Sequence, residues 1–213
     1  PTTELFTVRD YVHTLETPEP LDVVSEGERQ NKFELFVGHY RAPRFQEGNV
    51  PYQEQGTGAF RFENDGTPII QGEEDLRFAL SIPIDREMPE AGWPVVLYGH
   101  GTGGNFKSFI GSRVAANLAR VGLAVLSIDQ IHHGPRDPRP DGCHEQASPD
   151  ACVALLFFNF VVPTAGRDNV RQSAVDLVSL LRLARNFDLQ LPVPENDDEA
   201  APMPPPSDDT GDA

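Results

Sequence analysis

The sequence predicts an α/β fold, and three observations support this prediction. Two continuous apolar runs, at 94–98 and 123–128, are typical of strands that are buried on both faces. A helical pattern lies between them at 105–121, which indicates a strand–helix–strand unit with parallel strands. Two earlier segments, 33–37 and 76–84, alternate apolar and polar residues with a period of two. That alternation predicts antiparallel strands with one solvated face.

The turns and helices between these strands are marked by capping residues. Asp65-Gly66 lies between short apolar runs and predicts a tight hairpin turn. In the 105–121 pattern, Asn105 is expected as the N-cap and Gly122 as the C-terminal stop. A second helix is expected over 168–186. Its predicted buried stripe consists of Val170, Ala174, Leu177, Val178, Leu181 and Ala184. Arg171, Asp176, Arg182 and Arg185 are expected to face solvent mostly.

Composition divides the chain into three parts. Residues 1–32 have weak periodicity and are expected to form an extended arm. Residues 33–190 carry the strand and helix patterns of the main domain. Residues 191–213 are expected to be a disordered linker, because 192–213 hold six prolines, seven acidic residues and no basic residue.

Charge and hydropathy exclude some classes of partner. The formal net charge is −16, so no basic surface is expected to bind a nucleic-acid backbone. No apolar run approaches the roughly 20 residues that a transmembrane helix needs. The sequence begins at Pro1 without a methionine, which is compatible with removal of an export signal.

The two cysteines suggest a cell compartment. Cys143 and Cys152 lie in the polar segment DGCHEQASPDAC and would pair readily in an oxidising compartment. Such a short disulfide loop is worth about 2–3 kcal/mol in the chain-entropy model. The alternative is a pair of free thiols in a cytosolic protein. We expect the disulfide, and with it a secreted, periplasmic or cell-surface location.

The glycine loop at 99–104, GHGTGG, fits two unrelated motifs. It matches G-x-G-x-x-G, the fingerprint of a dinucleotide pyrophosphate site. It also matches H-G-x-G-G, a loop whose backbone N–H groups bind an oxyanion. Two antiparallel-type strands precede the loop, Asn105 follows it as a cap, and His100 places a bulky side chain in the turn. These features favour the oxyanion loop.

Three segments in order resemble the α/β-hydrolase superfamily, in particular bacterial lipases and esterases. They are VVLYGHGTGGN, GLAVLSIDQIHHG and FFNFVVPTAGRDNVRQSAVDLVSLLRLAR, and the resemblance covers about 75–187. The second contains a D-x-x-x-H-G turn at Asp129, His133 and Gly134. The resemblance implies that 33–190 is the N-terminal part of a hydrolase domain. It also implies a mostly parallel sheet with antiparallel N-terminal strands, incomplete in this chain.

The resemblance also assigns roles within the loop. It implies that the Thr102 backbone N–H is the oxyanion donor, with Gly101 and Gly103 allowing close approach and His100 supporting the loop. His132 and His133 are expected as turn residues, since adjacent side chains point in different directions. No metal or cofactor is implied, and no substrate-binding residues are predicted. The apolar stretch 151–163 is expected to line an acyl pocket, to form part of a lid, or to be a buried element.

The resemblance leaves the nucleophile outside this sequence. None of the serines lies in the G-x-S-x-G elbow of these enzymes. A C-terminal remainder, either continuous or a separate chain after cleavage, is therefore expected to supply Ser, Asp or Glu, and His. It would pair with the strand at 94–98, whose open edge predicts that residues 1–213 alone are insoluble or inactive. The expected activity is carboxylic-ester hydrolysis. The alternatives are a dinucleotide-dependent oxidoreductase and a non-catalytic hydrolase-like binding module.

Overall fold

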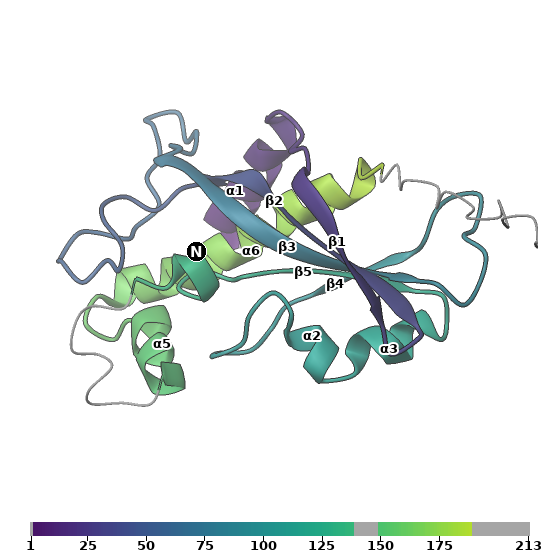
Figure 1. Cartoon of the computed structure of the whole chain (residues 1–213). Coiled ribbons are helices and arrows are strands. Elements are labelled where there is room, and N and C mark those ends of the chain that lie inside the picture. Colours follow the sequence, from purple (N-terminus) through teal and green to yellow (C-terminus); the bar gives the residue numbers. More distant parts are fainter. Residues whose placement is uncertain (1, 139–148, 189–213) are drawn as a thin grey trace, which may run out of the picture.

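The computed structural model describes residues 2–138 and 149–188, which form a mixed α/β fold (Figure 1). One sheet contains the five strands β1 (Leu21–Arg29), β2 (Phe33–Arg44), β3 (Gly72–Pro83), β4 (Val95–Tyr98) and β5 (Ala124–Ile128). The helices are α1 (Thr2–Thr14), α2 (Ser108–Gly111), α3 (Val114–Ala119), the 3₁₀ turn η1 (Gly134–Arg136), α5 (Pro149–Phe158) and α6 (Pro163–Arg185).

The α/β class is confirmed, but the expected mostly parallel sheet is wrong for the described residues. The strand order is β1-β2-β3-β5-β4, and only the β4–β5 pair is parallel. The other three pairs are antiparallel. The reason lies in the connections, because only β4 and β5 are joined by a helical crossover. Between β1 and β2, a short turn holds Gln30 and Asn31 at positive φ, as tight hairpins require.

Helices cover both faces of the sheet (Figure 1). On one face Leu76, Phe78 and Leu80 of β3 pack with Leu180 and Leu183 of α6. The predicted alternation in β3 is therefore confirmed. Its other face is not solvated at Ala79 and Ser81, because α2 and α3 cover that side of the sheet. Burial of both faces by helices gives β3 the environment of a central strand.

The N-terminal segment and the first predicted helix differ from expectation. Residues 2–14 form α1 and residues 21–29 form β1 where an extended arm was expected. Val8 and Val12 of α1 are buried against Phe45 and Phe60. The 105–121 pattern forms two short helices, because Arg113 between them has a left-handed φ of 62°. Segment 191–213 lies outside the described residues.

Strand β4 lies at the edge of the sheet, where complete burial is not possible. Its residues are intermediate or exposed, and Val95 is 41% exposed. The expected burial of this strand on both faces is therefore wrong. By contrast, all five residues of β5 are buried, as predicted. At Asp65-Gly66 the predicted turn forms, with Gly66 N donating to Glu63 O at 3.0 Å.

Helix α6 buries a different face from the one predicted. It begins at Pro163, Val170 is 53% exposed, and Leu181 is 37% exposed. The buried positions include the polar residues Asp168, Asn169, Arg171, Gln172, Asp176 and Arg182. Hydrophobic periodicity failed here because these side chains bond to distant groups of the chain, which compensate for their burial.

Candidate functional site

The glycine loop 99–104 leaves the carboxyl end of β4 and makes a tight turn. Gly104 N donates to Gly101 O at 3.0 Å, and Gly103 has a φ of 81° that only glycine adopts easily. Gly101, Thr102 and Gly103 are exposed, and a Cβ at Gly101 would meet no atom within 4 Å. Within the described ranges, the Thr102 N–H has no hydrogen-bond acceptor. The loop therefore presents the Thr102 N–H as a free backbone donor at an open position.

Two histidines connect this loop to the turn that follows β5. His133 Nε2 accepts a hydrogen bond from Gly103 N at 3.2 Å. In the opposite direction, His100 Nε2 accepts one from Gln130 N at 3.1 Å. The two rings meet edge to face with centroids 4.7 Å apart. Gln130 Nε2 also donates to His100 O at 3.2 Å, so three hydrogen bonds join the two segments.

The contacts of Asp129 explain why the D-x-x-x-H-G turn has an aspartate at its start and a glycine at its end. Its carboxylate accepts from Phe106 N at 3.0 Å and forms an ion pair with Arg77. Gly134 has a φ of 56°, and a Cβ there would lie 2.5 Å from Asp129 Cγ. The turn therefore needs glycine at this position. Asp129 holds the start of the helical crossover against the end of β5.

Asn105 makes a local turn and does not cap a helix directly. Its Oδ1 accepts from Lys107 N at 2.8 Å, while α2 begins only at Ser108. Because α2 has four residues, little helix dipole points at the glycine loop. This arrangement differs from the long helix N-terminus that binds a pyrophosphate.

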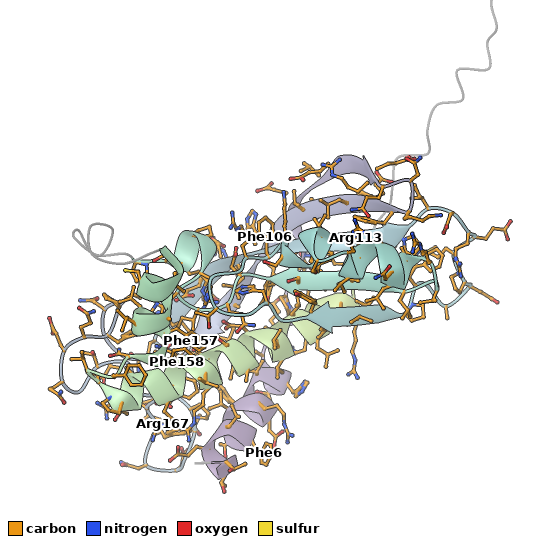
Figure 2. The ribbon with its side chains drawn as sticks, turned by 90° about the horizontal axis from the view of Figure 1, so that it is seen from below. Phe6, Phe106, Arg113, Phe157, Phe158 and Arg167 are labelled. Atoms are coloured by element: carbon orange, nitrogen blue, oxygen red, sulfur yellow. The ribbon has the colours of Figure 1, made fainter. Side chains whose placement is uncertain are left out.

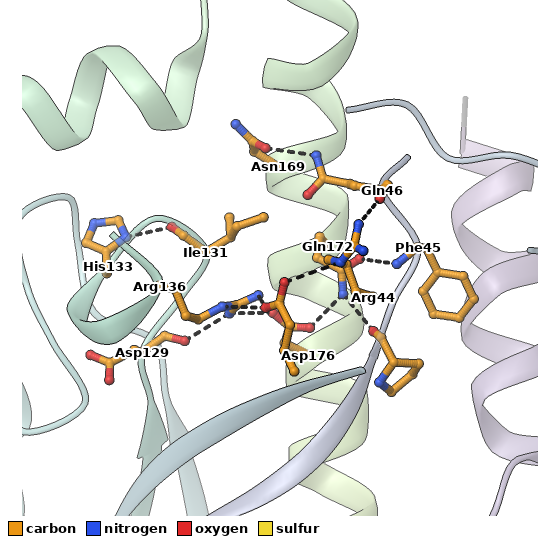
Figure 3. A network of polar contacts seen from close by, with 12 residues as sticks. Arg44, Phe45, Gln46, Asp129, Ile131, His133, Arg136, Asn169, Gln172 and Asp176 are labelled. Carbon is orange, nitrogen blue, oxygen red and sulfur yellow. Dashed lines mark hydrogen bonds and ion pairs between the residues drawn. The ribbon is translucent and has the colours of Figure 1, made fainter. Parts of the chain in front are cut away.

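A buried ion cluster lies beneath the turn (Figure 3). Arg136 Nη1 donates to Asp176 Oδ2 at 2.7 Å and to Asp129 O at 3.1 Å, and its Nε donates to Glu74 Oε2 at 2.9 Å. Burial opposes the charge on Arg136, but Asp176 and Glu74 together raise its pKa. Burial also raises the pKa of Asp176, and Arg136 opposes that rise. Sequence reasoning missed Arg136 and Glu74, because neither lies in a recognisable motif.

The R-D-N-x-R-Q stretch of α6 binds the loop that follows β2. Asp168 Oδ2 accepts from Phe60 N at 2.9 Å, and Gln172 Oε1 accepts from Phe45 N at 2.9 Å. Asn169 Oδ1 accepts from the Gln46 side chain at 2.9 Å (Figure 3). These contacts are structural, because each polar side chain satisfies a buried group.

His132 and His133 point in different directions, as predicted. The His132 ring lies against Tyr52, with centroids 6.1 Å apart, while His133 lies against His100. Burial lowers the pKa of His132 to about 4, and Arg136 contributes to this shift. In the part of the chain that the structure describes, no three His, Cys, Asp or Glu side chains are grouped as a metal site.

Helix α5 brings an aromatic residue to the histidine pair. The Phe157 and His133 rings have centroids 5.9 Å apart, and Figure 2 shows Phe157 and Phe158 at the end of α5. Phe158 and Phe160 are exposed, whereas Cys152 and Leu156 are buried. The 151–163 stretch is thus a half-exposed helix and its following turn. The Cys143–Cys152 disulfide stays a prediction, because Cys143 lies outside the described residues.

Comparisons with protein-family models, curated proteins and solved structures found no match to this chain. The site is therefore interpreted from its own geometry. A pocket of about 620 Å³ lies away from the glycine loop and is lined by Trp93, Val95, Leu126 and Phe187, among others. No helix within 2–138 and 149–188 is long and apolar enough to cross a membrane.

Proposed function

We propose that this chain supplies the oxyanion-binding loop and half of the sheet of a serine carboxylic-ester hydrolase of lipase or esterase type. The observation that carries the proposal is the free Thr102 N–H at the carboxyl end of β4. Ligands of sheets with parallel strands bind at this end. Preorganised backbone donors are the standard means of stabilising a tetrahedral oxyanion.

The sheet supports a C-terminal remainder as partner. β4 lies at the edge and is only partly buried, so a further parallel strand there would cover it. In the proposed reaction a serine Oγ from the remainder attacks the ester carbonyl carbon, and a histidine takes the serine proton. The carbonyl oxygen then carries the negative charge and accepts a hydrogen bond from Thr102 N–H. The proposed reaction uses no metal or cofactor.

A fluorophosphonate probe tests the reaction class in the full-length protein. We expect one covalent serine adduct, outside residues 1–213, with loss of p-nitrophenyl ester turnover. If no serine of the protein is labelled, the mechanism is refuted. The same protein is then the non-catalytic binding module, unless titration with NADH or FAD shows spectral binding, which supports the oxidoreductase.

A matched pair of variants tests the assigned donor. Thr102→Pro removes the backbone N–H, while Thr102→Ala keeps it and shortens the side chain. We expect Thr102→Pro to lower kcat about 100-fold or more relative to Thr102→Ala. The thermal unfolding of both variants checks that the fold persists. Equal kcat values for the two folded variants would show that Thr102 N–H is not the donor.

A further inference from the structure

We propose that His100 and His133 form a reciprocal, acid-sensitive clasp that positions the 101–104 loop. Each histidine accepts a backbone N–H from the opposite segment: Gly103 N donates to His133, and Gln130 N donates to His100. The structural part of this proposal stands on these contacts alone. Its consequence for catalysis rests on the proposed function.

Hydrogen-bond partners define the tautomer of both rings. His133 Nδ1 lies 2.9 Å from Ile131 O, and His100 Nδ1 lies 2.8 Å from Gly101 O. A carbonyl oxygen only accepts, so each Nδ1 carries the hydrogen. Each Nε2 therefore keeps a lone pair, as an acceptor of a backbone N–H must. Both rings are neutral in the closed clasp.

Protonation of His133 breaks the clasp. A hydrogen on Nε2 would face the Gly103 N–H, so an attractive contact would become a repulsive one. The neighbours offer little compensation. The ring faces His100 from the glycine loop and the uncharged Phe157 ring from α5. On its own segment the acidic neighbours are Asp129, whose carboxylate is paired with Arg77, and Asp137.

The environment sets the direction of the pH response. Burial lowers the pKa of His133, Ile131 O opposes this shift, and His100 adds to it. The neutral acceptor thus persists through neutral pH and is lost only below the ordinary histidine range near 6.5. Loss of the Gly103 contact frees a glycine next to Thr102. The oxyanion donor is then no longer held in place, which lowers kcat more than it changes KM.

Hydrogen exchange of the full-length protein tests the clasp without any activity. Exchange is measured by mass spectrometry across 99–106 between pH 7.5 and 4.5, after correction for the intrinsic rate. We expect protection of the wild type to fall by up to about tenfold per pH unit once His133 titrates. Protection across β5 serves as the internal control, because global unfolding would expose both segments.

Three variants separate the clasp from a general structural role. His133→Gln supplies an amide oxygen that accepts but does not titrate, so protection across 99–106 should fall less on acidification than in the wild type. His133→Leu has no acceptor for Gly103 N–H, so the amides of 99–106 should exchange rapidly at every pH in this variant. His13→Gln changes an exposed histidine of α1 and should match the wild type. Unchanged protection in His133→Leu, or an acid response in His133→Gln as large as that of the wild type, overturns the proposal.

Activity gives a second, distinguishable readout. Each kcat is normalised to the same variant's value at pH 8, because a catalytic histidine would titrate in all of them. We expect the acid decline of kcat to be shallower in His133→Gln than in the wild type, with similar KM. Identical declines would show that the clasp does not position the donor. If the exchange results hold but no variant hydrolyses esters, the clasp stands and the proposed function fails.

Discussion

His132 should make the folded protein sensitive to acid. The side chain is buried, and burial lowers its pKa from 6.5 to about 4. In the unfolded chain the imidazole recovers its ordinary pKa, so between these values the unfolded state binds more protons than the folded state. Stability therefore rises with pH across this window and is lost as pH falls.

The magnitude follows from the difference between the two pKa values. For one imidazole whose pKa is 6.5 in the unfolded chain and about 4 in the folded protein, the free energy of unfolding falls by about 2.5 kcal/mol between pH 7.5 and 4.5. That is a substantial part of the 5–15 kcal/mol that typically stabilises a native protein. The loss should be measurable by urea unfolding at the two pH values.

The variant His132→Asn isolates this contribution. Asparagine tolerates the left-handed φ of 62° at this position and does not titrate. The variant should be less stable at pH 7.5, because its contact with Tyr52 is lost, but its stability should fall by about 2.5 kcal/mol less on acidification. His13→Asn, at an exposed position, should keep the wild-type response. Wild-type and His132→Asn responses that agree within about 0.5 kcal/mol would refute the buried neutral imidazole.

Two further substitutions test the packing around α6. Asp176→Asn leaves the buried Arg136 paired with Glu74 alone, and should cost about 3 kcal/mol in urea unfolding. Gly166→Ala should destabilise by more than about 2 kcal/mol in the same assay, because its Cβ would lie 2.1 Å from Phe158 O. Gly111→Ala, where a Cβ meets nothing within 4 Å, should be neutral or slightly stabilising.

Control substitutions show whether the loss of stability is specific to the buried cluster and to the close contact at Gly166. Asp75→Asn removes a carboxylate from an exposed pair with Arg41 and should change stability by less than about 1 kcal/mol. A cost for Asp176→Asn no larger than this would mean that the buried cluster is not stabilising. Gly166 and Gly111 variants of equal stability would contradict the close approach of α6 to the end of α5.

The local elements were predictable where the signal was local. The apolar run at β5, the alternation in β3 and the Asp65-Gly66 turn each depend on neighbouring residues, and each was confirmed. The glycine loop and the Asp129 to Gly134 turn could also be located, since their glycines mark unusual backbone positions. The reciprocal use of His100 and His133 could not be predicted, because the donors lie 30 residues from the acceptors.

The sequence by itself determined the α/β class, the buried strand β5 and the position of a loop able to present a free backbone donor. Only the tertiary structure decided the mostly antiparallel sheet and which face of α6 is buried. Hydrophobic periodicity reports apolar side chains alone. On α6, Asp168 and Gln172 are buried because Phe60 N and Phe45 N, more than 100 residues away, need acceptors. That pairing exists only once the chain has folded.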